Sequence, residues 1–178
     1  MTAVDPRVAM LAGLVRDVPD FPRPGIVFKD ITPLLANPRG LATAVELLAE
    51  RFADARIDTV VGIESRGFLF AAPLAVRLGA GFVPARKPGK LPSHVDRVEY
   101  ALEYGTDALE LHRDAIRAGS RVLLVDDVVA TGGTAWATAE LVRRQGGVVC
   151  AAAFLIELSF LPGRARLAPV ETTALLAY

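Results

Sequence analysis

Short apolar runs rich in β-branched residues alternate along the chain with longer amphipathic segments. The runs have the length and composition of β-strands, and the longer segments repeat their apolar residues with the period of an α-helix. Strands are predicted at residues 57–64, 81–85, 121–126, 148–158 and 172–178. Helices are predicted at residues 6–18, 38–55, 67–79 and 132–147. This alternation is typical of an α/β fold with an open, mostly parallel sheet flanked by helices.

Two of the predicted strands are apolar on both faces. The runs VLLV at 122–125 and AAAFLI at 151–156 are continuous rather than alternating. This is the pattern of parallel strands that helices cover on both sides, so we expect both at the centre of the sheet.

Two other stretches, 19–38 and 88–107, follow no regular period. The first is rich in proline but too apolar for a flexible tether. The second is long for a connection within a compact domain, and such connections are usually functional or mobile.

Composition narrows the class of protein and of partner. The 178 residues suit one domain, with 52% hydrophobic residues and 20 basic against 20 acidic side chains. This balance creates no long-range field toward nucleic acid or anionic lipid, so small molecules or other copies of the chain are the expected partners. No secretory leader and no apolar stretch of the ~18 residues that span a membrane is evident, which predicts a cytoplasmic protein. The single cysteine, Cys150, excludes an intrachain disulfide.

The stretch VLLVDDVVATGGT, residues 122–134, carries the strongest chemical signal. Asp126 and Asp127 follow a buried strand, and TGGT at 131–134 opens the next helix. A helix start with glycines suits a phosphate, whereas carboxylates accept hydrogen bonds from hydroxyls or join a magnesium shell. The combination indicates a sugar phosphate, unless the aspartates only cap the helix and the glycines only form its turn. The stretch is neither a Walker loop nor a dinucleotide-binding loop, because it lacks the residues that define them.

The same stretch resembles the phosphoribosyl-pyrophosphate signature of the type I phosphoribosyltransferases. Other segments that resemble this family, in the same order, are FPRPGIVFKDITPLL, GIESRGFLF, RKPGKLP, LEYGTDALELH and PGRARLAPVETTALLAY. They cover nearly the whole chain and are similar to the members that act on adenine. The resemblance implies the type I fold as a single domain over 1–178, with a small N-terminal hood at about 18–38 and a flexible lid at about 88–107.

The activity implied by the resemblance is purine salvage, in which adenine and 5-phosphoribosyl 1-pyrophosphate give AMP and pyrophosphate. The sugar should become oxocarbenium-like, so the enzyme must stabilise a departing polyanion and exclude water. Mg²⁺ is the implied cofactor, held mainly by the substrate's diphosphate and hydroxyls, so no protein metal ligand is predicted. A homodimer is also implied.

The family also implies roles for residues of each motif. The acidic pair would hold the ribose hydroxyls, the loop after it the 5′-phosphate, and ESRG at 64–67 with Lys87 and Lys90 the pyrophosphate. Arg86 would face the active site of the neighbouring subunit. Apart from the resemblance, ESRG is typical of a solvated helix start, and the basic cluster is typical of a solvent-exposed surface. The residues implied to bind phosphoribosyl pyrophosphate or AMP are Asp126, Asp127, Ala130, Thr131, Gly132, Gly133, Thr134, Ser65, Arg66, Arg86, Lys87, Lys90 and Tyr104.

Two further motifs of the family are implied to bind the base and to transfer its proton. Glu103 in LEYG is the implied general acid/base on the purine, near N7, and Tyr104 would help close the lid. Phe28 would stack on adenine, while Val27 would offer its backbone N–H and C=O to the adenine edge. The lid departs from the family, whose small hydroxylated residues are replaced here by SHVDRVE at 93–99.

Two other functions share the opening stretch. One is a xanthine or 6-oxopurine phosphoribosyltransferase, which would not be expected to carry PGIVFKDITPLL. The other is a non-catalytic regulator that senses the sugar pyrophosphate; such proteins tend to carry a DNA-binding domain or a basic surface, and this chain shows neither.

Overall fold

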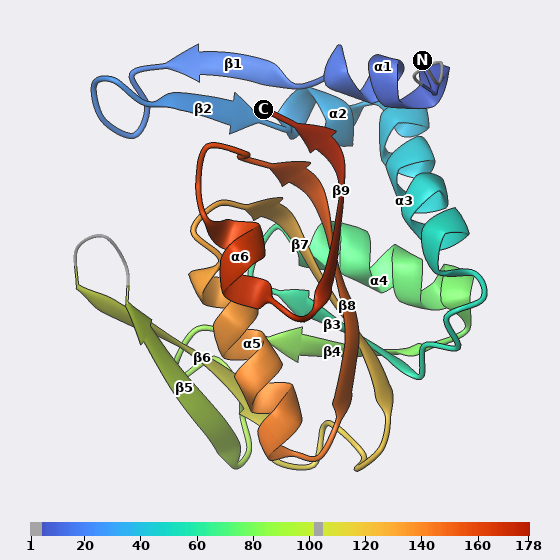
Figure 1. The fold of residues 1–178 in the computed structure, drawn as a ribbon, viewed down its shortest axis with the longest axis vertical. Coiled ribbons are helices and arrows are strands. Elements are labelled where there is room, and N and C mark those ends of the chain that lie inside the picture. The colour runs from blue at the N-terminus through green and yellow to red at the C-terminus, as the bar shows by residue number, and fades with distance from the viewer. Residues whose placement is uncertain (1–4, 102–104) are drawn as a thin grey trace.

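A five-stranded parallel sheet forms the centre of the computed structural model, which describes residues 5–101 and 105–178. The strand order is β4-β3-β7-β8-β9, and all four neighbouring pairs are parallel (Figure 1). The sequence prediction of a mostly parallel α/β sheet is therefore confirmed. The strands are β3 (Thr59–Ile63), β4 (Gly81–Ala85), β7 (Arg121–Val129), β8 (Val148–Glu157) and β9 (Glu171–Ala177).

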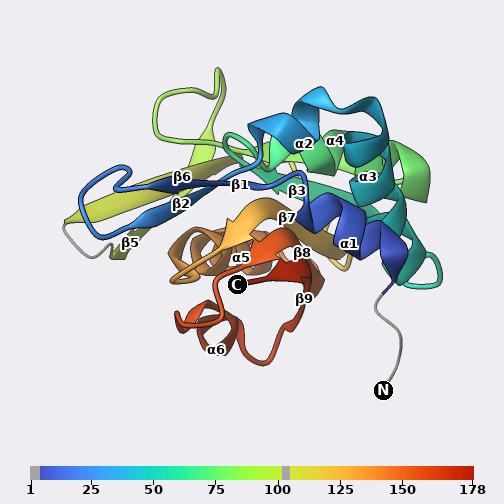
Figure 2. The same ribbon diagram turned by 90° about the horizontal axis from the view of Figure 1, so that it is seen from above.

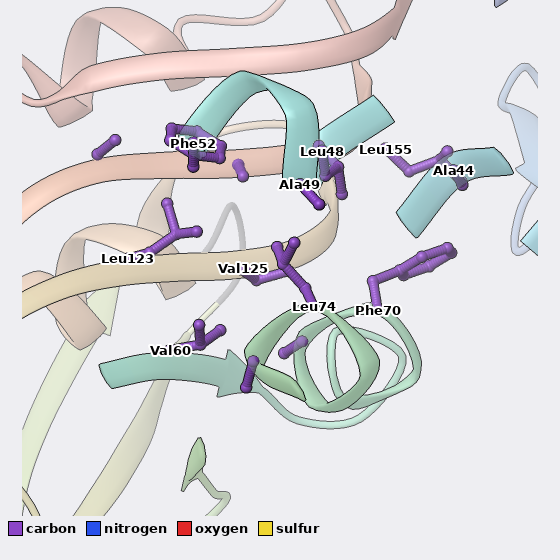
Figure 3. Packing of buried hydrophobic residues seen from close by; sticks show 14 of the residues in the cluster. Ala44, Leu48, Ala49, Phe52, Val60, Phe70, Leu74, Leu123, Val125 and Leu155 are labelled. Atoms are coloured by element: carbon purple, nitrogen blue, oxygen red, sulfur yellow. The ribbon is translucent and has the colours of Figure 1, made fainter. Parts of the chain in front are cut away.

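Helices cover both faces of this sheet, as the continuous apolar runs predict. On one face lie α1 (Pro6–Ala12), α3 (Pro38–Phe52) and α4 (Phe68–Leu78); on the other lies α5 (Gly133–Arg144). Leu123 and Val125 of β7 belong to the core that contains Leu48 of α3 and Leu74 of α4 (Figure 3). Leu124, on the opposite face of β7, belongs to the core under α5. Because β7 is buried on both faces, it lies at the centre of the sheet, and its carboxyl end is held in a fixed position.

The N-terminal helix is shorter than predicted. Helix α1 ends at Ala12, and the predicted helical residues 16–18 instead form β1 (Arg16–Pro19), which pairs antiparallel with β2 (Val27–Asp30). Cross-strand ion pairs explain the strand: Arg16 contacts Asp30 at 2.5 Å, and Lys29 contacts Asp17 at 2.7 Å. The prediction of helix through residue 18 was wrong because these pairs involve partners 12 to 14 residues away.

The stretch 88–107 is more regular than predicted. Strand β5 (Val95–Ala101) pairs antiparallel with β6 (Thr106–His112), and the hairpin packs against α5. Val98 and Tyr100 alternate with exposed residues along β5, which is the period of a strand with one buried face. The assignment of residues 95–101 and 106–107 to an irregular segment was therefore wrong.

The β1–β2 hairpin lies beyond the carboxyl end of the sheet (Figures 1 and 2). The short helix α2 (Thr32–Ala36) leads from it into α3, and the other short helix, α6 (Gly163–Leu167), lies between β8 and β9. No helix within residues 5–101 and 105–178 is both long and apolar enough to cross a membrane.

Candidate active site

A cavity of about 480 Å³ opens at the carboxyl end of the sheet. In open α/β sheets this edge is where ligands bind. The cavity joins β2, the turn after β3 and the end of β7, three segments that are far apart in sequence. Its lining includes the predicted residues Val27, Phe28, Ser65, Arg66, Asp126, Asp127 and Ala130, together with Ile26, Lys29, Glu64, Val128 and Leu158.

Both members of the acidic pair lie inside the strand, although the prediction ended it at Asp126. Strand β7 continues to Val129, three residues beyond its predicted end, and both Asp126 and Asp127 are buried. Asp126 Oδ1 accepts a hydrogen bond from the Asp127 N–H at 2.8 Å. Burial raises the pKa of Asp126 well above its usual range, and the neighbouring Asp127 charge raises it further. Two carboxylates this close favour a ligand that stabilises their charge.

Arg66 lies between the acidic pair and the β1–β2 hairpin. Its Nε is 2.8 Å from Asp127 Oδ2, and its guanidinium carbon is 5.3 Å from the centre of the Phe28 ring. The Asp127 Oδ2 atom is buried, yet it accepts no hydrogen bond of good geometry from the described residues. A buried acceptor in this state has the capacity to bind a hydroxyl group.

Glu64 is a site residue to which the sequence reasoning assigned no role of its own beyond its place in the ESRG motif. Its buried carboxylate contacts Arg86 Nε at 3.3 Å, accepts the Lys87 backbone N–H at 2.8 Å and is ion-paired with Lys90 Nζ. Burial acts to raise the pKa of Glu64, but these hydrogen bonds outweigh burial and lower it to about 2. A signal was present in the sequence, because Glu64 is the last residue of a predicted strand, as Asp126 is.

The basic cluster is therefore divided between two carboxylates. Arg86 and Lys90 pair with the carboxylate of Glu64 at the edge of the cavity. The Arg86 guanidinium also donates a hydrogen bond to the Lys90 carbonyl at 3.3 Å. The Lys87 ammonium points elsewhere, toward Asp107 on β6 and Tyr100 on β5. These two partners come from the β5–β6 hairpin, and the sequence reasoning did not single them out.

The TGGT loop lines a second pocket of about 200 Å³ next to the first. Gly132 has a φ of 77°, and a Cβ atom there would lie 2.7 Å from the Gly163 carbonyl oxygen. A Cβ on Gly133 would lie 3.0 Å from Tyr100 Cδ2. The loop is thus held between α6 and the hairpin at the start of α5, where backbone N–H groups are free for an anion. The predicted residues Ala130, Thr131, Gly132, Gly133 and Thr134 all line this pocket.

The β1–β2 hairpin contributes the aromatic side chain of Phe28, together with Val27, to the lining of the cavity. Phe28 packs edge-on against Phe21, with ring centres 5.2 Å apart. Val27 is half exposed and pairs with Pro19 in the strand ladder. Because proline has no N–H, Pro19 cannot donate to the Val27 carbonyl. Lys29 anchors the hairpin through Asp17 and through the ring of Tyr178, whose centre is 3.9 Å from Lys29 Nζ.

Two predicted site residues, Glu103 and Tyr104, lie outside the described residues. The nearest described residues in sequence are Ala101, at the end of β5, and Gly105, just before β6. Among residues 5–101 and 105–178, no group of three or more His, Cys, Asp or Glu side chains is arranged to hold a metal ion.

The fold and the site together define a class of protein. The sequence profile of the phosphoribosyl transferase domain matches residues 30–166, and the chain belongs to this phosphoribosyltransferase family.

Within the family, several adenine phosphoribosyltransferases are similar to this chain. The enzyme of that name from Sorangium cellulosum is 64% identical over 154 residues, which are 86% of this chain and 77% of the relative. A crystal structure from Thermoanaerobacter pseudethanolicus is 48% identical with a TM-score of 0.94, over 96% of this chain and 99% of the other. The Saccharomyces cerevisiae enzyme, solved with an imino-altritol bisphosphate and adenine, is 42% identical with a TM-score of 0.91 over the same shares.

Proposed function

We propose that this chain transfers the phosphoribosyl group of 5-phosphoribosyl 1-pyrophosphate to adenine, forming AMP and pyrophosphate in purine salvage. The observation that carries this function is the 480 Å³ cavity, in which the hairpin, the turn after β3 and the acidic pair converge. A sugar with a leaving group on one side and a base on the other needs these three walls, and the adjacent pocket of the TGGT loop would take its 5′-phosphate. The relatives named above carry the same activity in their names. In this proposal one domain comprises the sheet, the hood at about 18–38 and the lid at about 88–107.

The sugar and its 5′-phosphate are assigned to the end of β7 and the loop after it. Asp126 and Asp127 would accept hydrogen bonds from the ribose hydroxyls, and Asp127 Oδ2, which is ion-paired with Arg66 but accepts no hydrogen bond of good geometry from the described residues, supports this role. Their negative charge would also favour an oxocarbenium-like sugar, because positive charge develops on it as the bond to pyrophosphate breaks. The backbone of Ala130 and of residues 131–134 would hold the 5′-phosphate at the start of α5.

The pyrophosphate is assigned to the turn after β3 and the loop after β4. Ser65 lines the cavity beside Glu64, which gathers Arg86 and Lys90 at its rim. We propose that these cations and Lys87 neutralise the departing polyanion. Arg66 is expected to move from Asp127 toward the leaving group when substrate arrives, because the ribose hydroxyls compete for the same carboxylate.

Adenine is assigned to the hairpin wall. Phe28 would stack on the base, and the Val27 carbonyl, which Pro19 cannot bond, would accept the 6-amino group. A 6-oxo purine has an acceptor in place of that donor, and two facing acceptors would be left unpaired. Glu103 is the proposed general acid/base near N7, while N9 forms the bond to the anomeric carbon and Tyr104 helps to close the lid.

Magnesium is proposed to enter with the sugar pyrophosphate. Its chemistry would be to neutralise charge on the diphosphate, and its preferred ligands are oxygens with several waters. The donor set fits such a mainly substrate-held ion, since the cavity offers the oxygens of two adjacent carboxylates next to the proposed ribose hydroxyls. Asp126 and Asp127 would contribute through those hydroxyls.

We further propose a cytoplasmic homodimer. Val76 on α4 is 81% exposed, and Leu69 on α4 and Phe82 on the edge strand β4 are also exposed. Covering these side chains with a second copy would remove apolar surface from water next to Arg86, which directly follows β4. Light scattering should give about twice 18.9 kDa, and a single-chain mass at micromolar concentration would contradict the dimer. The charged substrates cross lipid poorly, which supports a cytoplasmic location.

The experiment that tests the activity is a base panel. Initial rates are measured with phosphoribosyl pyrophosphate, Mg²⁺ and either adenine, hypoxanthine, guanine or xanthine, with the nucleotide product identified by chromatography. Of the four bases, only adenine should give substantial turnover. Comparable turnover with a 6-oxopurine would identify the other enzyme class, and tight binding of phosphoribosyl pyrophosphate with no turnover on any base would identify the regulator.

A further inference from the structure

Lys87 is held away from the cavity by two groups of the β5–β6 hairpin. Its ammonium is ion-paired with Asp107 Oδ2 and donates to the Tyr100 hydroxyl oxygen at 3.0 Å. The Tyr100 hydroxyl in turn donates to the same Asp107 oxygen at 3.2 Å. Tyr100 and Asp107 face each other across the hairpin, so the strand register brings these two groups together.

This cluster lies between the two regions assigned to phosphate groups. On one side, the Lys87 backbone N–H is bonded to Glu64 in the turn assigned to pyrophosphate. On the other side, Tyr100 lines the pocket of the TGGT loop and lies against Gly133. A movement of the Lys87 side chain alone would therefore bring its ammonium to a bound phosphate. In the ligand-free protein, the ammonium is instead paired with the Asp107 carboxylate.

Asp107 is the more firmly fixed of the two charged partners. Its second oxygen, Oδ1, accepts the Ala108 N–H at 2.7 Å, and its own backbone is part of the strand ladder. If Lys87 leaves, Oδ2 keeps the hydrogen bond from Tyr100. Lys87 reaches the cluster on a flexible four-carbon stem, so the lysine is the group that can move.

We propose that Asp107 is a positioning residue that holds the Lys87 ammonium in the ligand-free protein and competes with pyrophosphate for it. The inference rests on the proposed function, because that function places pyrophosphate beside Lys87. Binding of pyrophosphate must then break the Lys87–Asp107 pair and bring a polyanion near a carboxylate. Both effects weaken the bound state, so the pair favours release of the product.

The test is the affinity for pyrophosphate at fixed Mg²⁺, measured by titration calorimetry on the full chain. Asp107→Asn should bind pyrophosphate about 2- to 5-fold more tightly, the range for a partly exposed charge pair. Asp96→Asn is the matched control, because Asp96 lies on the same hairpin, pairs with Arg113 and is equally exposed, at 30% against 31%. It should leave the affinity unchanged. A merely structural role for Asp107 would weaken binding, which is the opposite sign.

Two further variants keep the test decisive. Asp107→Ser removes the same charge with a smaller side chain, so it should also tighten pyrophosphate binding, and it serves if Asp107→Asn does not fold. In a Lys87→Met background, Asp107→Asn should lose its tightening effect. Unchanged or weaker binding in Asp107→Asn, or tightening that persists without Lys87, would overturn the inference. If the unaltered protein neither binds pyrophosphate nor forms AMP, the proposed function fails and this inference fails with it.

Discussion

Replacing Glu64 with glutamine removes the negative charge that joins the turn after β3 to the loop after β4. The Glu64 side chain is 8% exposed and pairs with Arg86, Lys90 and the Lys87 backbone. Glutamine keeps the shape and can still accept the Lys87 N–H through its amide oxygen. The variant therefore isolates the contribution of the charge to the free energy of unfolding.

The magnitude follows from the pKa. An ordinary glutamate value of 4.5 and a folded-state value of about 2 correspond to about 3 kcal/mol of stability at neutral pH. Water can replace part of the lost pairing, because Arg86 and Lys90 are themselves partly exposed. We therefore expect Glu64→Gln to lower the free energy of unfolding by about 1–2 kcal/mol at pH 7.

The direction of the pKa shift determines how the stabilisation by Glu64 changes with pH. The folded-state pKa of Glu64 is lowered, so its stabilisation is present above the ordinary value of 4.5 and is lost as the pH falls through about 2. The difference between the unaltered protein and Glu64→Gln should be constant from pH 7 to 5 and should shrink between pH 4.5 and 2. Urea unfolding at pH 7, 5, 4 and 3, followed by circular dichroism, measures it.

Glu99→Gln is the control for this prediction. Glu99 is 65% exposed, with an ion pair to Arg97 at 3.0 Å, and exposed pairs contribute little to stability. Its substitution should change the free energy of unfolding by less than about 0.5 kcal/mol at every pH. If Glu64→Gln is as stable as the unaltered protein at pH 7, or if its deficit does not shrink in acid, the Glu64 cluster does not stabilise the fold as argued.

Three other substitutions test the acidic pair, the hairpin and the TGGT loop one at a time. Asp126→Asn should raise the free energy of unfolding of the ligand-free protein by roughly 1 kcal/mol at pH 7, since the raised pKa means that its charge is unfavourable there. Its turnover should fall, and thermal unfolding beside steady-state rates measures both. Phe28→Ala should raise the KM for adenine about 10-fold while changing the KM for phosphoribosyl pyrophosphate less than twofold. Thr134 lines the pocket assigned to the 5′-phosphate, and we expect its hydroxyl to add a hydrogen bond to that phosphate. Thr134→Val should therefore weaken AMP about 10-fold and leave adenine unaffected in calorimetry, because only AMP carries the phosphate. Gly132→Val is a poorer probe, because its φ of 77° and the nearby Gly163 carbonyl predict a loss of stability.

Each of these has a contradicting outcome. A destabilised Asp126→Asn protein would mean that the charge is stabilised in the free protein. Equal losses for both substrates in Phe28→Ala would make Phe28 a structural anchor of the hairpin. Unchanged AMP affinity in Thr134→Val would move the 5′-phosphate away from that hydroxyl.

The sequence by itself determined the sheet and much of the ligand-binding edge. The continuous apolar runs of β7 and β8 predicted central parallel strands, and the helical periods of α3, α4 and α5 predicted their cover to within a few residues. The acidic pair and the TGGT loop could be located because a strand, a turn and a helix start are consecutive there. These features depend on neighbours along the chain, so local pattern and local chemistry were enough to find them.

Only the tertiary structure decided how the basic and acidic groups of the site are paired. The β1 and β5 strands form because of partners in another strand, which a local period does not reveal. Glu64 and Lys87 are 23 residues apart, and Lys87 and Asp107 are 20 apart. Such pairs arise where separate strand ends meet at one edge of the sheet. Burial and mutual charge act on these groups only after the chain has folded, which is why residue types alone could not assign Lys87 to Asp107 or Arg66 to Asp127.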